Sequence, residues 1–454
     1  MLSQLRELEG EYANELVVIG VHAGKFTAER NTANIRQAIL RLEVEHPVVN
    51  DRAFRTWRSY AVTAWPTLIL IDPEGYVVDV HPGEITADSY RELVARVVDD
   101  SARHGTLDRR PLTFRPEAAG EPPHPLAFPE KVLVDPPRLF IADSGHHRLV
   151  VVVLREGGAS ATVELIAGRG APGLVDGSLD QAAFNRPQGM ALQGQVLYVA
   201  DTESHAVRAI DLPRREVSTV AGTGDAASRL QRAGFALRVP LNSPSDLALK
   251  GDGLYIALAG THQIWRLDLA TSGLRPYAGS GFEELADGPN LSAALAQPSG
   301  LSAGDHELYV ADSEASAIRA ISLPAAQVYT IVGAGLFDFG DRDGIGDEVR
   351  LQHAQGLTWH DGLLYIADTY NNKIKVLDPQ TRQAQTLVGT GEPGWRDGEA
   401  ATFYEPRGIS AAGDRLYVAD TNNHVIRIVD LTTRRVSTLE IEGLQAQTPC
   451  EPGG

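Results

Sequence analysis

Aspartate and histidine residues recur at fixed places along this chain, and they are the side chains best suited to chemistry. An aspartate ends a short apolar run in five copies, Asp143, Asp201, Asp312, Asp368 and Asp420. A histidine follows that position by four residues in four copies, His147, His205, His262 and His424. Carboxylates and imidazoles bind metals and transfer protons. The pattern therefore raises the question of a metal centre or an acid–base site.

Substitutions within the series favour a structural role. Leu258 replaces the aspartate in one copy, and Ser316 and Asn372 replace the histidine in two others. Equivalent atoms of neighbouring repeats are too far apart to share an ion whose bonds are about 2 Å long. We expect the aspartates to cap turns by accepting backbone N–H groups. We expect each histidine to bond within its own blade, and we predict no metal or cofactor.

These residues belong to a unit that occurs six times. The copies start at Pro129, Pro187, Pro244, Pro298, Ala354 and Pro406, between 52 and 58 residues apart. Each holds four short runs rich in β-branched and aromatic residues, separated by Gly, Pro, Asp and Ser, which predicts four strands. One four-stranded sheet cannot bury both faces, so the units must pack against each other. The repeats predict a six-bladed β-propeller over residues 129–444.

The repeats resemble NHL repeats. The matching segments are Ala200–Arg208, Ala367–Lys375 and Ala419–Arg427, and Gly-rich ends such as Val220–Gly224 and Val388–Gly391 complete the signature. Some NHL propellers bind RNA, and Arg208, Arg319, Lys375 and Arg427 recur at one repeat position. The chain carries a formal net charge of -18. We therefore predict that these cations are solvated strand ends or partners of carboxylates, and that nucleic acid is not the ligand.

The centre of the predicted ring offers few groups for catalysis. The innermost strands are expected at Val132–Val134, Met190–Leu192, Leu247–Leu249, Leu301–Ala303, Leu357–Trp359 and Ile409–Ala411, with almost no ionisable side chain. Propeller enzymes hold metal or acid–base residues in this channel. A metal-dependent hydrolase or lyase is therefore a weaker alternative here.

The first hundred residues have a different pattern. Helices are expected at 1–12, 31–42, 54–60 and 89–99, because apolar residues recur there at helical spacing. Leu16–Val21 is a continuous apolar run, which predicts a strand buried on both faces. Further strands are expected at 46–51, 65–71 and 76–81. Alternating helices and strands predict an α/β domain over residues 1–105.

This order resembles the redoxin branch of the thioredoxin-like fold. The resemblance rests on Val17–Val21, the step Trp65-Pro66-Thr67 into a strand, and the Asp72–Gly75 hairpin. It implies that Pro66 is the cis-proline that faces the active-site disulfide in that fold. It also implies a central strand and a Cys-x-x-Cys motif, which this sequence does not contain. Either the motif lies upstream of Met1, or the domain is naturally degenerate; we expect the former.

The remaining segments connect or extend these domains. Residues 106–128 are rich in proline and predict an extended linker, and 445–454 are expected to be a disordered tail. Cys450 is the single cysteine, so an intrachain dithiol is impossible. No apolar run is long enough to span a membrane. Cytoplasm is the default compartment, although a missing N-terminus could hide a targeting signal.

Together the two halves predict an α/β truncated thioredoxin-like domain followed by an all-β six-bladed NHL propeller. This combination resembles the family named for NHL repeat-containing protein 2. We expect a non-catalytic scaffold that binds a protein or peptide on a propeller face. The main alternative is a thiol–disulfide redox protein whose Cys-x-x-Cys lies upstream.

Overall fold

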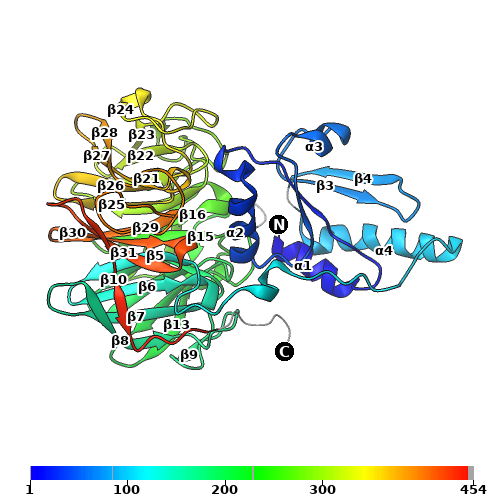
Figure 1. Cartoon of the computed structure of the whole chain (residues 1–454), viewed down its shortest axis with the longest axis horizontal. Coiled ribbons are helices and arrows are strands. Elements are labelled where there is room, and N and C mark those ends of the chain that lie inside the picture. Colours follow the sequence, from blue (N-terminus) through cyan, green and yellow to red (C-terminus); the bar gives the residue numbers. More distant parts are fainter. Residues whose placement is uncertain (1, 84, 228–229, 448–454) are drawn as a thin grey trace. The chain divides into compact units, whose positions relative to one another are not determined.

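The computed structural model describes residues 2–83, 85–227 and 230–447. Its contacts divide the chain into two compact units, Met1–Pro122 and Pro123–Gly454. The division falls within the proline-rich segment. Each unit is described below by itself, with the element labels of Figure 1.

The first unit contains four helices and four strands among its described residues. The helices are α1 (Leu2–Glu11), α2 (Thr32–Arg41), α3 (Arg55–Ser59) and α4 (Ala87–His104), with 3₁₀ turns η1 (Ala28–Arg30) and η2 (Glu117–Gly120). The strands are β1 (Gly20–His22), β2 (Val48–Asn50), β3 (Thr67–Ile71) and β4 (Val77–Pro82). β1 pairs with β2 in parallel, and β3 pairs with β4 as an antiparallel hairpin.

Local signals explain where the long helices begin and end. The side chain of Asn31 accepts the N–H of Ala33 at the start of α2. Thr86 and Ser89 form a reciprocal capping box at the start of α4, and Gly105 ends that helix in the left-handed region. The core of this unit lies between α1, α4 and the β3–β4 hairpin, and it contains Leu8, Leu70, Ile85, Ala87, Tyr90 and Val94.

One strand prediction in this unit is wrong. The run Leu16–Val21 is not a continuous strand buried on both faces, because regular pairing covers Gly20–His22 alone. Ile19 is 58 % exposed, and Val17 and Val21 are also exposed. β-Branched composition raises strand propensity, but regular strand geometry needs a hydrogen-bonded neighbour on at least one side.

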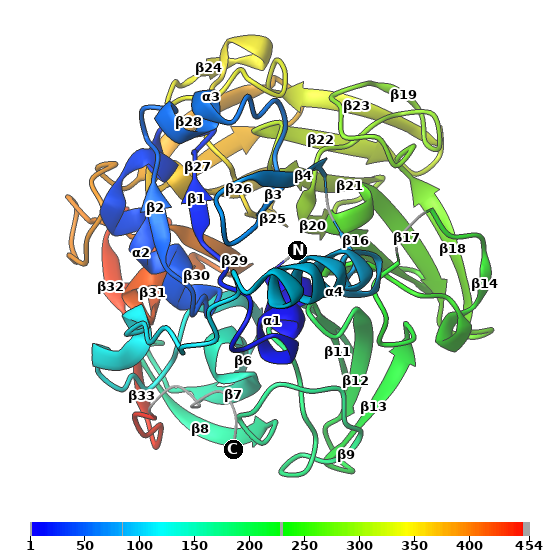
Figure 2. The ribbon, with the colours of Figure 1, turned by 90° about the vertical axis from the view of Figure 1, so that its right-hand side faces the viewer.

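The second unit is the predicted six-bladed propeller, and Figure 2 looks onto its ring of blades. Blades 1 to 3 are β5–β8 (Pro129–Asp135, Arg138–Asp143, Arg148–Leu154, Ser160–Ala167), β10–β13 (Pro187–Gln193, Val196–Asp201, Ala206–Asp211, Glu216–Ala221) and β15–β18 (Pro244–Lys250, Gly253–Leu258, Gln263–Asp268, Gly273–Ala278). Blades 4 to 6 are β20–β23 (Pro298–Ala303, Glu307–Asp312, Ala317–Ser322, Gln327–Val332), β25–β28 (Gly356–His360, Leu363–Asp368, Lys373–Asp378, Gln383–Val388) and β29–β32 (Pro406–Ala412, Arg415–Asp420, Val425–Asp430, Val436–Thr438).

The propeller core consists of six apolar clusters, one at each junction between neighbouring blades. The second strand of a blade is buried on both faces, as the burial of Leu139–Asp143 in β6 shows. This burial explains why those strands are apolar at consecutive positions. A single blade would expose both faces, so each blade depends on its neighbours.

Short connector strands join successive blades. β9 (Gly177–Ser178), β14 (Gly234–Phe235), β19 (Gly288–Pro289) and β24 (Gly344–Ile345) each precede a blade and pair with its outermost strand. In blade 1 that place is taken by β33 (Glu440–Glu442), which pairs in parallel with β8 and closes the ring. The last strand segment of the propeller is thus divided between β32 of blade 6 and β33 on blade 1.

Strand direction determines which loops share a face of the ring. The first and third strands of a blade run one way, and the second and fourth run the other way. The turns between strands two and three therefore lie on the same face as the connectors between blades. Most of these turns are short 3₁₀ segments, such as η3 (Ser144–His146), η5 (Ala259–Thr261), η7 (Thr369–Asn371) and η8 (Thr421–Asn423). The connectors of blades 3 and 5 add η4 (Ala236–Arg238) and η6 (Gly346–Glu348).

Candidate functional site

The repeated aspartates form a buried brace within each blade that carries one. In blade 2, the N–H of Asn185 donates to Asp201 Oδ1 at 2.6 Å. Arg208 Nη1 donates to Asp201 Oδ2 at 2.9 Å, and Arg208 Nη2 reaches Asp176 of the connector at 2.8 Å. Asp176 in turn accepts the N–H and hydroxyl of Thr219 on the outer strand. The brace thus ties the connector to three strands of the blade.

The same brace recurs with small changes. Blade 4 uses Asp312, Arg319, Asp287 and Thr330, and blade 6 uses Asp420, Arg427, Asp397 and Thr438. In blade 5 a lysine, Lys375, lies between Asp368, Asp341 and Asp343. In blade 1, Asp143 pairs with Arg148 at 2.7 Å and with His146 at 2.9 Å.

The recurring cations are therefore partners of carboxylates and not solvated strand ends. Arg208, Arg319, Lys375 and Arg427 are fully buried. Each aspartate accepts a backbone N–H, as predicted, but the donor is a connector residue sixteen positions earlier and not a residue of the adjoining turn. Burial raises the pKa of Asp201 to about 7, and the charge of Arg208 opposes that shift.

The repeated histidines latch each blade to the next. Nδ1 of His147, His205, His262 and His424 accepts the N–H of Arg186, Ser243, Gln297 and Phe128, respectively, at 3.1–3.2 Å. Each donating residue directly precedes the innermost strand of the following blade, with blade 1 following blade 6. The prediction that these histidines bond within their own blade is therefore wrong, because each donor leads into the first strand of the next blade.

Two other residue types serve the same latch. The hydroxyl of Ser316 accepts the N–H of His353, and the amide oxygen of Asn372 accepts the N–H of Glu405. Both latch residues have positive φ, as do the four histidines. The position therefore requires a short acceptor side chain on left-handed backbone, and it does not require titration.

An ion pair that the sequence analysis missed lies in the central channel. Lys131 Nζ of blade 1 lies 3.0 Å from Asp246 Oδ2 of blade 3. It also donates to the carbonyl oxygens of Ser299 and Gln355, in blades 4 and 5. The N–H of Leu301 donates to the same Asp246 oxygen. One lysine thus ties four blades together across the channel.

The channel strands begin earlier than predicted, which explains the omission. The first three residues of a copy, which read Pro-x-Gly at Pro187, Pro298 and Pro406, form the irregular first part of the strand and contain the start of the register shift. The glycine of that segment is present in four copies, Gly189, Gly300, Gly356 and Gly408. Lys131 and Asp246 occupy it in the other two. Opposite charges at one repeat position were the signal that could have identified the pair.

Close packing explains the four glycines. A Cβ at Gly189 would collide with Asp246, one at Gly356 with the carbonyl of Arg407, and one at Gly408 with the backbone of Lys131. Next to this ring, Arg407 pairs with buried Glu130 at 2.9 Å, which joins blade 6 to blade 1. The ring and the ion pair border a cavity of about 240 Å³, lined mainly by small and apolar residues such as Ala191, Ala248 and Ser302.

No cluster in the described parts of the chain places three His, Cys, Asp or Glu residues where they could hold a metal ion. Within the same residues, no helix is both long and apolar enough to cross a membrane. Cys450 lies outside the described residues.

The connectors expose large apolar side chains. Phe282, Phe337 and Trp395 lie on three successive connectors and are 74 %, 70 % and 58 % exposed. Leu230 of the connector before blade 3 is half exposed. By the strand directions given above, these residues lie on the face that also carries the latch turns. Phe282, Phe337 and Trp395 are the most exposed large apolar side chains among the described residues of this unit.

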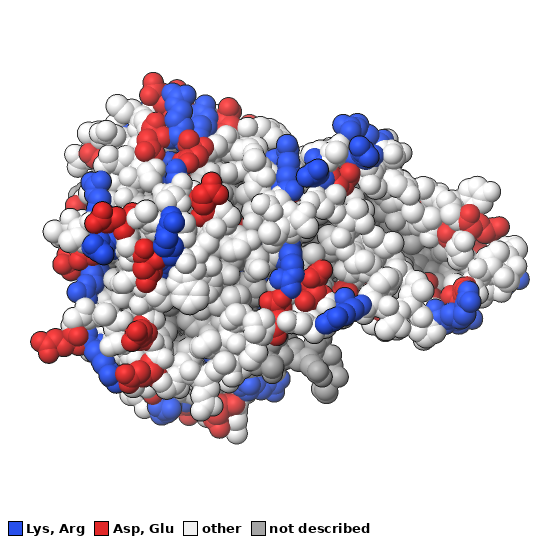
Figure 3. Space-filling view, viewed as in Figure 1, with Lys and Arg blue, Asp and Glu red and all other residues white. Residues whose placement is uncertain are grey.

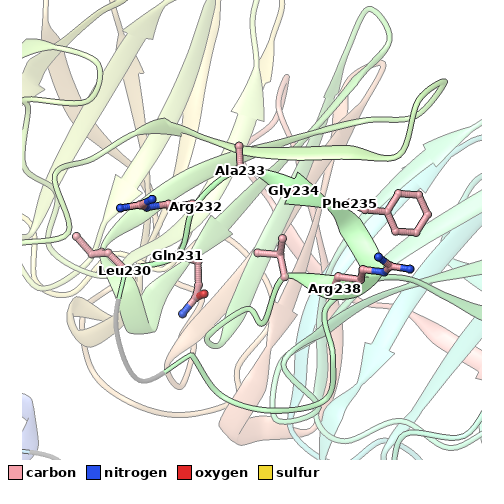
Figure 4. A pocket seen from close by; sticks show the side chains of 8 residues that line it. Leu230, Gln231, Arg232, Ala233, Gly234, Phe235 and Arg238 are labelled. Atoms are coloured by element: carbon pink, nitrogen blue, oxygen red, sulfur yellow. The ribbon is translucent and has the colours of Figure 1, made fainter.

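The long connector before blade 3 also forms a shallow hollow of about 560 Å³. Its lining runs from Leu230 to Val239 and includes two arginines. Figure 4 shows Arg232 and Arg238 at opposite ends of the loop, pointing away from each other. Their guanidinium groups therefore do not converge on one anion.

In the first unit, the residues around Pro66 form an aromatic cluster. The Trp65–Pro66 peptide bond is cis, and Thr67 begins β3. The indole N–H of Trp65 donates to the carbonyl of Ala23 at 2.8 Å. The rings of Trp57 and Trp65 lie 4.5 Å apart, and Phe54 packs edge-on against Trp57.

Comparison with known proteins places this architecture in a family. A profile of the NHL repeat matches residues 184–210 and 403–429, which cover the first three strands of blades 2 and 6. NHL repeat-containing protein 2 of Homo sapiens is 40 % identical over 97 % of this chain and 66 % of its own length. Its counterpart in Bos taurus is 39 % identical over 100 % of this chain and 68 % of its own length.

A plant protein is similar as well. Protein SUPPRESSOR OF QUENCHING 1, chloroplastic, of Arabidopsis thaliana is 40 % identical over 99 % of this chain and 45 % of its own length. The chain thus spans about two thirds of its animal relatives and less than half of the plant protein. Since the similarity to the animal proteins extends over nearly the whole chain, the chain belongs to the family of NHL repeat-containing protein 2.

Proposed function

We propose that this chain is a non-catalytic scaffold whose propeller binds a partner protein through the connector face. The observation that supports the proposal is the series of exposed aromatic side chains on successive connectors, Phe282, Phe337 and Trp395. Aromatic residues are enriched among the anchors of protein interfaces. The braces hold the connectors in place, so these anchors are presented with little loss of conformational entropy on binding.

The charge around these anchors indicates the chemistry of the partner. Glu283 and Glu284 follow Phe282, and Glu392 and Glu399 flank Trp395; all four carboxylates are exposed. Arg396 also lies beside Trp395. Because carboxylates predominate on these two connectors, a partner segment with apolar and basic side chains fits them best.

We further propose that the first unit is a thioredoxin-like accessory domain. The parallel β1–β2 pair, the β3–β4 hairpin and the flanking helices support this assignment. That fold has one further strand between the strands that correspond to β1 and β3. Among the residues described, β1 and β3 pair with one strand each. We retain cytoplasm as the proposed compartment, which is compatible with the single cysteine; the name of the plant relative places that protein in the chloroplast.

The proposal predicts that Phe282→Ser/Trp395→Ser weakens partner binding at least thirtyfold, which corresponds to about 2 kcal/mol for loss of a single anchor. Partners would be identified by crosslinking and mass spectrometry of the full chain, and their affinities measured with purified components. Tyr329→Ser is the matched control, because Tyr329 is an exposed aromatic residue on outer strand β23 and not on a connector. Unchanged affinities in the double variant, with unfolding midpoints equal to the parent's, would contradict the proposal.

A further inference from the structure

A basic stripe lies on helix α3 of the first unit. Arg55 and Arg58 lie three residues apart on the helix, so their side chains share one side of it, and Arg52 lies in the turn just before the helix. All three are exposed. None of them pairs with a carboxylate in the part of the chain that the structure describes. Figure 3 shows basic side chains gathered over α3.

Several other arginines of this unit pair with nearby carboxylates. Arg91 pairs with Glu7, Glu11 and Asp88, Arg36 with Glu117 and Glu121, and Arg103 with Asp100. Residues 1–105 contain 11 Lys or Arg and 16 Asp or Glu. Arg52, Arg55 and Arg58 form no ion pair among the described residues, although the charge of Arg58 interacts with the buried carboxylate of Asp51, and they are a local concentration of positive charge on an acidic unit.

Beside these arginines lies a partly exposed aromatic cluster, formed by Phe54, Trp57 and Trp65. Trp65 is 49 % exposed, and its ring is held by the bond from its indole N–H to Ala23 and by contact with Trp57. Phe54 packs against both indoles from one side, at centroid distances of 5.8 and 6.5 Å. These contacts orient the Trp65 ring and leave about half of it exposed as an apolar surface.

The segment that carries both features is rigid. The carboxylate of Asp51 accepts the N–H of Arg55 at 2.7 Å and the N–H of Trp57 at 2.9 Å. Asp51 is itself buried. It therefore holds the backbone at the start of α3, from which Arg55, Trp57 and Arg58 project.

We propose that this surface, formed by Arg52, Arg55, Arg58, Trp57 and Trp65, binds a short acidic peptide segment that contains a proline or aromatic side chain. The arginines supply charge complementarity, and guanidinium groups bind carboxylates with two parallel hydrogen bonds. The indoles supply the kind of aromatic surface that docks extended, proline-containing peptides. Three cations beside an acidic remainder suit a peptide better than a nucleic acid, whose binding relies on many phosphate contacts.

This site is independent of the connector face, because the two lie in different units and select opposite charges. Its test uses the full chain and a fluorescein-labelled twelve-residue peptide of Glu, Asp, Pro and Tyr, followed by anisotropy. We expect Arg52→Gln/Arg55→Gln/Arg58→Gln to weaken binding at least tenfold, and raising salt from 50 to 300 mM to weaken the parent's binding. Trp65→Phe should weaken it by a smaller factor while leaving the salt dependence unchanged.

The matched control is Arg96→Gln/Arg103→Gln/Arg110→Gln, which removes the same charge from three other exposed arginines of this unit. It should bind the peptide as the parent does. Equal weakening in the control, or no binding to the parent at 50 mM salt, would overturn the proposal. A twelve-nucleotide oligo-dT that binds more tightly than the peptide, and is lost in the first variant alone, would also overturn it by identifying a nucleic-acid site.

Discussion

At the scale of single residues, the blade latch explains why histidine, serine and asparagine alternate at one repeat position. Each supplies an acceptor to an N–H of the following blade. The residue that donates this N–H also has positive φ, as Phe128 and Glu405 do. Each of these two residues directly precedes the innermost strand of its blade. A donor on such backbone cannot join the sheet ladder, so the side chain from the previous blade satisfies it.

The latch predicts a pH dependence at His424. Burial lowers its pKa to about 3, whereas in the unfolded chain it is about 6.5. Because the pKa of His424 is lower in the folded protein, the stability that neutral His424 confers is present above pH 6.5 and is lost as pH falls toward 3. We expect His424→Asn, which adopts the residue of blade 5, to lose less stability than the parent between pH 7.5 and pH 4.5. Urea unfolding followed by circular dichroism measures this difference.

A control for His424→Asn is available in the same unit. His306 is an exposed histidine in a turn of blade 4, and His306→Asn should leave the pH dependence of the urea midpoint unchanged. The explanation fails if the parent and His424→Asn lose the same free energy of unfolding over this pH range.

At the scale of the blade, the end of the second strand is filled in two ways. Five blades bury an aspartate, and the third uses Leu258 with Trp265, whose indole N–H donates to Gln263. Replacing a buried ion pair by well-packed apolar residues is often neutral for stability. Blade 3 therefore indicates that apolar residues can replace the buried ion pair, which favours a structural role for the pair over a catalytic one.

The brace predicts that Arg208→Met destabilises the propeller by about 3–5 kcal/mol, because it leaves a buried carboxylate without its cation. The pKa of Asp201 in the folded protein already lies above its value in the unfolded chain. The contribution of this carboxyl group to the free energy of unfolding is therefore lost as pH rises through the folded pKa. Removal of Arg208 raises that pKa further. The penalty of the variant relative to the parent should therefore be larger at pH 9 than at pH 6, as urea unfolding at the two pH values would measure.

Arg214→Met is the matched control, because Arg214 is largely exposed and pairs loosely with Asp211 at 3.7 Å. We expect its free energy of unfolding to stay within about 0.5 kcal/mol of the parent at both pH values. A penalty for Arg208→Met that is the same at pH 6 and pH 9 would show that lost packing, and not the unpaired carboxylate, is responsible.

At the scale of the whole propeller, the ring depends on its closure. β33 pairs with β8, and Leu439 is buried in the cluster that joins blade 6 to blade 1. Leu439→Ala should cost about 2–5 kcal/mol, as expected for a buried leucine. Because each blade is stabilised by both neighbours, the loss should shift one transition for the whole propeller. Leu291→Ala, at an exposed connector site, should stay within about 0.5 kcal/mol; an unchanged midpoint for Leu439→Ala would contradict this account of closure.

The sequence by itself determined the repeat, the number of blades and the family. These follow from local chemistry, because turn residues and β-branched runs recur at one spacing and each copy supplies the same four strands. The glycine position of the repeat can be identified in the same way. A comparison of the six copies at that position would have shown that Lys131 and Asp246 replace the glycine.

Only the tertiary structure decided which atoms those residues meet. The histidines bond to the next blade, the aspartates to a connector sixteen residues earlier, and Lys131 to three blades across the channel. The split between β32 and β33 is likewise a product of ring closure. These contacts depend on the geometry of a closed ring, which brings together residues far apart in sequence, and no local pattern in the chain encodes those distances.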